Sequence, residues 1–334
     1  MSHVKWNILL DEYFFFHNLR PATEWSYRKV VKSILAFSER YEFPDDISSR
    51  DVLVWRKYIL SGRNLSAQTW NNKIAHLRAL FNFGMEHGLL VSAKNPFNDC
   101  SVRKTVKQKK TLNQKQLARI YIIMQQKIID EEKDKARKRC ALYPAWFWLT
   151  VIDTLRYTGM RLNQLLHIKL CDINLDDGCI KLCLDGSKTH REWQVPVINS
   201  LKPQLVRLIK EARQAGVPSN GSVFNAYYYL SKFDMDSVRI DSNGMMQNIR
   251  SFFRRLSKEC GFPVSPHRFR HTLATELMRA PDRNLQLVKE LLGHRSVSTT
   301  MEYVEMNMDV IGRTLETELM FYASGVTTRS NHAR

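Results

Sequence analysis

The chain of 334 residues lacks a segment that could cross a membrane. Its longest apolar run, Cys140 to Ile152, is shorter than the roughly 20 residues that span a bilayer, and Pro144 interrupts it. The N-terminus also lacks the charged start and small-residue cleavage site of a signal peptide. We therefore expect a cytoplasmic protein with no membrane partner.

The sequence also lacks metal-binding motifs. None of its six cysteines forms a CxxC pair, and no Cys/His spacing is typical of a zinc site. Cys179 and Cys183 fall on one face of a predicted strand, where we expect buried thiols. These observations predict a reduced protein that uses no metal and no cofactor.

Acidic residues are scarce relative to basic ones. Thirty-three Asp and Glu face 51 Lys and Arg, which gives a net charge of +18 and an isoelectric point near 9.7. An excess of this size is typical of a polyanionic partner, most often nucleic acid. An anionic membrane is a competing interpretation, but no basic amphipathic anchor stands out. An RNA-binding protein is a further one, favoured by the charge alone.

The first hundred residues show helical periodicity and no strand pattern. Apolar residues recur at a period near 3.6 over Thr23–Tyr41 and Ser66–His87, and Asp51–Leu60 is another candidate helix. We predict a helical domain over residues 1–100. The following stretch, residues 101–111, carries five cations and no acid from Ser101 to Lys110. It is either a solvated linker or a linker that also lies along phosphates.

The pattern changes in the second part, residues 112–320. Helices are predicted over 112–139, 144–157 and 201–214, and again from Met245 onward. Between them, Cys179–Leu184 and Glu192–Val197 indicate a hairpin around the turn DGSKTHR. The fold class is therefore mainly α with a small antiparallel β-sheet, in two domains. Residues 321–334 are expected to form a flexible tail.

Polar side chains gather at the ends of the predicted elements of this second part. In SPHRFRHTLAT, Ser265 suits a helix cap and Pro266 the first helical position. Three-residue spacing puts His267 and Arg270 on one face. Arg268 and His271 lie off that face and are interpreted as structural or backbone-contacting. Further on, Thr299 and Glu302 have the spacing of a capping box.

The candidate catalytic set has six members, and each alone has an ordinary explanation as a surface charge, a helix cap or a boundary tyrosine. They are Arg161, Lys188, His267, Arg270, His294 and Tyr303. Together they suit chemistry on a phosphodiester. The guanidinium groups can hold the non-bridging oxygens. The phenol can attack once a histidine takes its proton, the second histidine can donate to a phosphate oxygen, and the lysine can protonate the departing 5′-oxygen. This reaction needs neither metal nor ATP.

These residues lie in stretches that resemble the tyrosine recombinases, or phage-type integrases. The stretches are TGMRLNQLLHIKLCDIN, DGSKTHREWQVPV, SPHRFRHTLATELM and LLGHRSVSTTMEYVEM, in the family's order. The resemblance covers about Leu112 to Leu319 and implies that Tyr303 is the nucleophile and that the other five residues complete the catalytic set. The N-terminal part is similar to the family's core-site-binding domain, and Arg103, Lys104 and Lys107 would follow the DNA backbone.

The resemblance also implies an assembly. The family forms a two-domain clamp on double-stranded DNA and acts as a tetramer on two sites through a Holliday junction. Residues 307–323 would then be a helix that docks on a neighbouring subunit, or alternatively on its own domain. We expect inverted-repeat core sites, no extra arm-binding module, accessory DNA-bending proteins as further partners, and a bacterial, nucleoid-associated location, with the gene on a mobile genetic element.

The sequence departs from the family pattern at two positions. Gln164 stands where an acid is common, and Phe269 stands where Leu is common. Other outcomes stay open. Related chemistry would suit a type IB topoisomerase or a telomere resolvase, and a DNA-binding regulator could keep the fold without catalysis.

Overall fold

The computed structural model describes residues 4–37, 41–103, 110–133, 140–183, 193–230, 242–279, 284–294, 296–301 and 303. It divides into two compact units, Met1–Gln108 and Lys109–Arg334. Lys188, Lys104 and Lys107 lie outside the described residues, as do the segments 307–323 and 321–334. In the described parts of the chain, no helix combines the length and apolar character needed to cross a bilayer.

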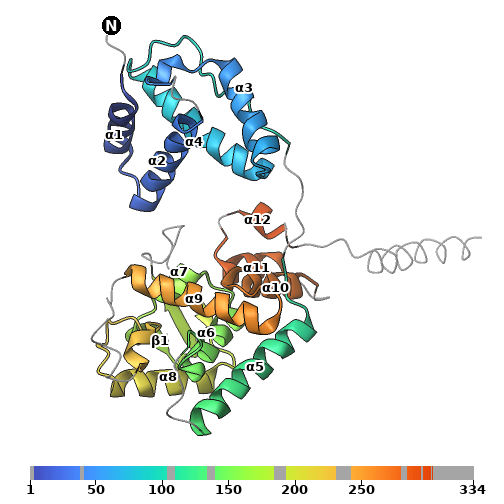
Figure 1. The fold of residues 1–334 in the computed structure, drawn as a ribbon. Coiled ribbons are helices and arrows are strands. Elements are labelled where there is room, and N and C mark those ends of the chain that lie inside the picture. The colour runs from blue at the N-terminus through green and yellow to red at the C-terminus, as the bar shows by residue number, and fades with distance from the viewer. Residues whose placement is uncertain are drawn as a thin grey trace, which may run out of the picture. The chain divides into compact units, whose positions relative to one another are not determined.

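The first unit is helical, as the periodicity predicts (Figure 1). Its elements are α1 (Trp6–His17), α2 (Pro21–Leu35), η1 (Pro44–Asp46), α3 (Ser49–Lys57), the π-helical η2 (Tyr58–Gly62) and α4 (Ala67–Glu86). Helix α4 confirms the helix predicted over 66–87. The Ser66 hydroxyl caps it by accepting a hydrogen bond from the backbone N–H of Thr69 at 3.2 Å. Helix α4 packs against α1 and α2 around the fully buried Trp55, Trp70 and Phe81.

The helix predicted to reach Tyr41 ends at Leu35 instead. The backbone carbonyl of Tyr41 accepts a hydrogen bond from the Trp6 indole at 3.0 Å, and the Tyr41 ring is buried. The prediction was too long because periodicity does not register this tertiary contact between α1 and the chain beyond α2.

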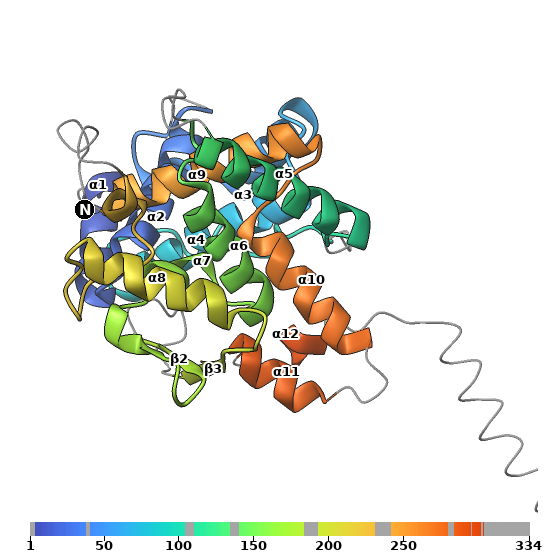
Figure 2. The same cartoon turned by 90° about the horizontal axis from the view of Figure 1, so that it is seen from below.

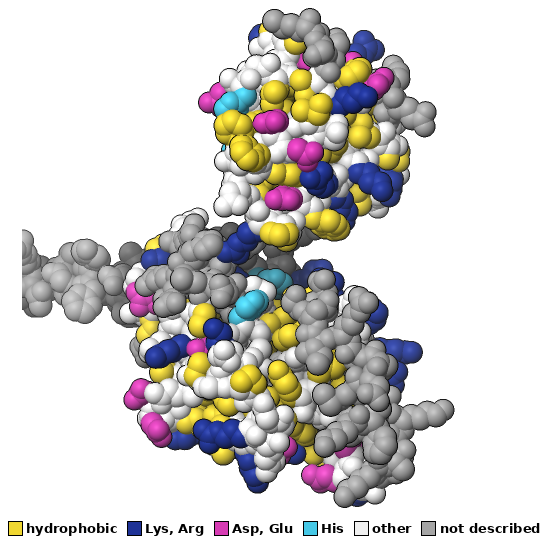
Figure 3. All heavy atoms as spheres, turned by 90° about the vertical axis from the view of Figure 1, so that its left-hand side faces the viewer, with side chains coloured by type: hydrophobic (Ala, Val, Ile, Leu, Met, Phe, Trp, Pro, Cys, Tyr) yellow, Lys and Arg dark blue, Asp and Glu magenta, His cyan; other side chains and the backbone are white. Residues whose placement is uncertain are grey.

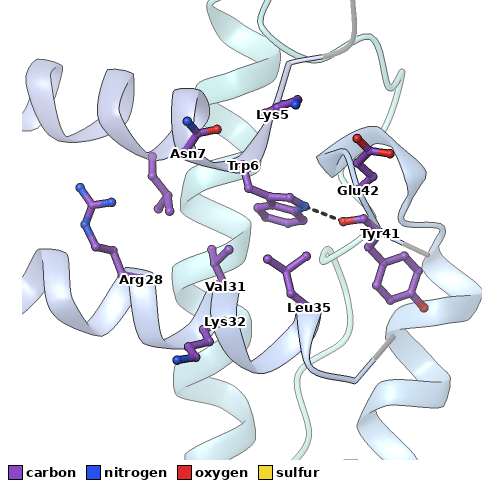
Figure 4. A pocket seen from close by; sticks show the side chains of 10 residues that line it. Lys5, Trp6, Asn7, Arg28, Val31, Lys32, Leu35, Tyr41 and Glu42 are labelled. Atoms are coloured by element: carbon purple, nitrogen blue, oxygen red, sulfur yellow. Dashed lines mark hydrogen bonds between the residues drawn. The ribbon is translucent and has the colours of Figure 1, made fainter. Parts of the chain in front are cut away.

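The surface of the first unit mixes apolar and charged side chains (Figure 3). Phe15 is 84% exposed, and Trp25 lies under the Lys29 ammonium at 4.8 Å. A groove of about 740 Å³ runs past Trp6, Arg28 and Val31 (Figure 4). None of the six candidate catalytic residues lines it, so the groove is not the candidate site.

The second unit is built around α6 (Ala145–Thr158), which packs against several other helices (Figures 1 and 2). Its Trp148 ring stacks on Phe252 at 4.3 Å. Around α6 lie α5 (Gln114–Lys133), α7 (Leu162–Leu166), η3 (Leu170–Asp172), α8 (Lys202–Gln214), η5 (Ala226–Tyr229), α9 (Ser242–Cys260), α10 (Pro266–Arg279), α11 (Leu285–Leu292) and α12 (Val297–Met301). Nearly every side chain of α6 is buried, which fixes the position of the chain that follows it.

The sheet has three antiparallel strands in the order β1 (Ile173–Asn174), β2 (Cys179–Leu182) and β3 (Trp193–Pro196). Strands β2 and β3 confirm the predicted hairpin, with Ile180 opposite Val195 and Leu182 opposite Trp193. Strand β1 was not predicted because two residues carry no periodicity. The fold class, mainly α with a small antiparallel sheet, is confirmed.

The expectation of buried thiols on this strand was wrong. Ile180 and Leu182 face the core, with exposures of 0% and 3%. Successive strand residues point to opposite faces, so the odd-numbered positions are turned away from the core. Cys179 and Cys183 are accordingly only half-buried, and the Cys183 thiol lies 3.6 Å from the Asp172 carboxylate.

Candidate active site

Helix α10 begins at Pro266, as predicted, and carries His267, Arg270 and His271 on its first two turns. Arg270 is 4% exposed, and hydrogen bonds from its guanidinium reach α6, α11 and His294. Nη1 donates to the Gly159 carbonyl at 2.7 Å, and Nη2 donates to the Leu292 carbonyl at 2.8 Å and to Nε2 of His294 at 2.8 Å. The carbonyls belong to the C-terminal ends of α6 and α11, where unpaired oxygens and the helix dipole favour a cation. Arg270 thus fixes α10 against both helix ends.

His294 follows Gly293, which ends α11 with a φ of 61°. Since a guanidinium only donates, Nε2 of His294 must accept the bond from Arg270. The proton of the neutral ring then lies on Nδ1, which donates to the Thr300 hydroxyl at 2.9 Å. In this arrangement His294 orients Arg270, and its Nε2 lone pair is already used.

Arg161 caps the N-terminus of α7, and its backbone N–H donates to Oε1 of Gln164 at 2.7 Å. Gln164 thus accepts the bond that the family's acid would accept. Two buried donors in this corner, Nη1 of Arg161 and Nε2 of Gln164, find no acceptor among the residues that the structure describes. Buried donors without acceptors are costly, so this corner suits an incoming anion such as a phosphate.

The positive charge of Arg161 acts on the guanidinium group of Arg270. Burial first, and then the charge of Arg161, lowers the pKa of Arg270 to about 10, while the Tyr303 phenol opposes this shift. Burial also lowers the pKa of Arg161, again opposed by Tyr303. Because the two cations repel each other across the site, a bound phosphate would relieve that repulsion as well as satisfy the donors.

Tyr303 is 4% exposed and packs on an apolar cluster that includes Ala274 and Leu292. Its phenol oxygen lies 3.0 Å from Nδ1 of His271, at hydrogen-bond distance. Its ring is nearly parallel to that of His294, with centroids 6.0 Å apart. The structure therefore brings the phenol, the two arginines and His294 together.

His271 is the residue whose contact the sequence interpretation missed. It was expected to be structural or to contact the backbone, but its ring lies against the Tyr303 phenol. The four-residue spacing from His267 was an available signal, because such residues are neighbours on a helix. The two imidazole rings are indeed stacked, with centroids 5.9 Å apart and an interplanar angle of 19°.

Three further residues of these motifs are His267, Arg268 and Thr299. His267 is exposed at the start of α10, next to His271. The Arg268 guanidinium donates to the Thr111 carbonyl at 3.3 Å, which suits a structural role for it. The predicted capping box at Thr299 was wrong, because α12 already begins at Val297, where Ser296 accepts from the backbone N–H of Ser298 at 3.1 Å.

Of the three linker residues expected to follow the DNA backbone, the structure describes Arg103. Arg103 is exposed where the described part of the first unit ends. Within the described ranges, no cluster of three His, Cys, Asp or Glu side chains is placed to hold a metal ion.

Comparison with known proteins assigns the family. The model of the phage integrase family matches residues 110–309. XerC-type tyrosine recombinases of Pseudomonas aeruginosa and Pseudomonas syringae are 36% and 34% identical over 90% and 91% of this chain. The chain spans 69% of the first relative's length and 62% of the second's.

Solved structures agree in fold. The match with an integrase of transposon Tn1549 bound to transposon right end DNA covers 94% of this chain and 99% of the integrase chain, with a TM-score of 0.68 at 19% identity. A lambda integrase tetramer bound to a Holliday junction covers 91% of this chain and 78% of its own, with a TM-score of 0.62 at 18% identity. The chain therefore belongs to the phage integrase family, the tyrosine recombinases, a class of enzymes that cleave and rejoin DNA. The resemblance inferred from the sequence is confirmed.

Proposed function

We propose that this protein is a site-specific DNA recombinase that cuts and rejoins DNA through a 3′-phosphotyrosine intermediate and a Holliday junction. The observation that supports this most is the buried Tyr303 phenol beside two guanidinium groups, one of which keeps a donor without an acceptor among the described residues. Such a pocket suits a phosphate that is attacked by the phenol.

The six residues divide the work. Arg161 and Arg270 hold the non-bridging oxygens and stabilise the charge that gathers at phosphorus. Tyr303 attacks, forming a bond from its oxygen to phosphorus as the bond to the 5′-oxygen breaks. Lys188 supplies the proton to that oxygen, His267 donates to a phosphate oxygen, and His294 keeps Arg270 in place through its hydrogen bond.

The partners follow from the family. We infer double-stranded DNA with inverted-repeat core sites, contacted by the helical domain over residues 1–100 and by Arg103, Lys104 and Lys107 in the linker 101–111. The lambda integrase tetramer on a Holliday junction supports a tetramer on two sites, with the segment 307–323 exchanged between subunits and accessory DNA-bending proteins at some sites. The setting that fits is a bacterial nucleoid in the cytoplasm, with the catalytic domain spanning residues 112–320.

The test of this function is covalent capture. Nicked suicide substrates that carry the inverted repeats flanking the gene should trap the wild-type protein on DNA, as a band that survives SDS. Tyr303→Phe should form no such band because the attacking oxygen is gone, while its affinity for the site stays within about twofold. Tyr228→Phe, on the short η5 element, is the matched control and should be captured normally.

Other outcomes would redirect the assignment. Strand cleavage by Tyr303→Phe would contradict the role of Tyr303. Relaxation of plasmids that lack any specific site would indicate a type IB topoisomerase, and closed hairpin products would indicate a telomere resolvase. Site binding without any covalent complex from the wild type would identify a catalytically inactive regulator.

A further inference from the structure

We propose that His271 is a further catalytic residue: its Nδ1 takes the phenolic proton when Tyr303 attacks. The inference rests on the proposed recombinase function and adds the group that activates the nucleophile. Its basis is the direct contact of 3.0 Å between that nitrogen and the phenol oxygen, which belong to residues 32 positions apart in the sequence.

The contact is held from both sides. His271 directly follows Arg270, which is anchored to two helix ends and to His294, so the backbone of α10 is fixed at this turn. The imidazole has two ring neighbours, His267 with centroids 5.9 Å apart and Tyr303 with centroids 5.5 Å apart. Geometry this constrained is what proton transfer in a transition state requires.

His294 is a poorer candidate for this step. A neutral imidazole has one lone pair, and that of His294 accepts a hydrogen bond from Arg270. Its N–H is directed at Thr300. Its ring lies nearly parallel to the tyrosine ring, with an interplanar angle of 10°.

Of the two arginines and His271 next to the phenol, only the imidazole can accept a proton. Arg161 and Arg270 both interact electrostatically with Tyr303. A guanidinium can only donate, so neither arginine can receive the proton. A neutral imidazole, by contrast, has a ring nitrogen that can accept a proton.

The step balances without any added reagent. The O–H bond of Tyr303 breaks and its proton moves to Nδ1 of His271, as the phenol oxygen bonds to phosphorus and the 5′-oxygen leaves with a proton from a separate donor. Rejoining reverses this order: the 5′-hydroxyl gives its proton back to that separate donor as its oxygen bonds to phosphorus, the phenolate leaves, and it recovers its proton from His271.

The experiment separates proton transfer from mere positioning. His271→Asn places an amide near the position of Nδ1 that can hydrogen-bond the phenol but cannot take its proton, and His271→Ala removes both abilities. Single-turnover cleavage of the nicked suicide substrate is followed from pH 6 to pH 10. Both variants should cleave about 100-fold more slowly than the wild type at pH 7.5, with normal DNA affinity and normal thermal melting.

The pH profile carries the decision. Without a local base, the variants should gain rate steadily as the pH rises, because hydroxide in solvent then removes the phenolic proton, while the rate of the wild type should depend less on pH. His167→Asn is the control: this exposed histidine, with Nδ1 on the Asn163 carbonyl at 2.7 Å, should behave as the wild type.

Three results would overturn the inference: His271→Asn matching the wild type in rate and profile, both variants cleaving normally, or both being inactive at every pH. If the wild type itself forms no covalent complex, the proposed function fails before His271 is tested.

Discussion

At the scale of single residues, the site is organised by buried charge that is satisfied in unusual ways. Two helix-end carbonyls and an imidazole, rather than a carboxylate, hold Arg270 in the described part of the chain. The second unit contains another buried charge, Asp153 on α6, which is 2% exposed and accepts a hydrogen bond from the Tyr121 hydroxyl at 2.5 Å. Burial raises the pKa of the Asp153 carboxyl to about 6, despite that hydrogen bond and the nearby Arg156.

This raised pKa makes a stability prediction. Between pH 4 and pH 6 the folded state holds a proton on Asp153 that the unfolded state releases, so the group's contribution to stability falls as pH rises through 6. Asp153→Asn cannot ionise. The unfolding free energy of Asp153→Asn minus that of the wild type should therefore increase by about 2 kcal/mol between pH 4 and pH 7. Urea unfolding at both pH values measures this, and a constant difference would contradict it.

At the scale of elements, the β2–β3 hairpin is packed onto the end of α11. A Cβ added to Gly293 would lie 2.5 Å from the Trp193 ring of β3, so only glycine allows this approach. Gly293 also has a φ of 61°, in the left-handed region. Gly293 thus ends α11 immediately before His294 and leaves room for Trp193 of β3, the strand that follows the predicted Lys188 turn.

Gly293→Ala should therefore destabilise the second unit by about 3 kcal/mol, as the sum of a left-handed backbone cost and overpacking against the indole. The matched control is Gly178→Ala, because Gly178 has a φ of 63° with open space around its Cβ position. It should cost only about 1 kcal/mol. Equal losses for the two variants in chemical unfolding would show that Trp193 does not resist the added methyl group.

At the scale of the whole molecule, the charge of +18 governs the encounter with DNA. Each phosphate neutralised by a lysine or arginine releases counterions, so the affinity for DNA should fall steeply with salt. The basic linker supplies part of this charge within a short stretch of chain, and Arg103 is exposed.

Replacing Arg103, Lys104 and Lys107 together by Gln should reduce the slope of log K against log salt by about 2 to 3, since each lost phosphate contact removes about 0.9. Fluorescence anisotropy with a labelled site, measured from 50 to 300 mM salt, provides the slope. An unchanged slope would mean that these cations stay in solvent when the protein binds DNA.

The sequence by itself determined features that depend on neighbours along the chain. Periodicity was enough to place the helix over 66–87, and the turn DGSKTHR between two strand-like stretches was enough to indicate the hairpin. The order and spacing of the four motif stretches were enough to reach the family, because they are local patterns of residue types.

Only the tertiary structure decided who contacts whom across the site. Arg270 is held by carbonyls that lie 111 and 22 residues away in sequence, and backbone oxygens carry no residue identity that a sequence could reveal. The contact between His271 and Tyr303 depends on where α10 and the turn after α12 meet. Such meetings are set by core packing, chiefly around α6, and a pattern of residue types along one chain does not encode them locally.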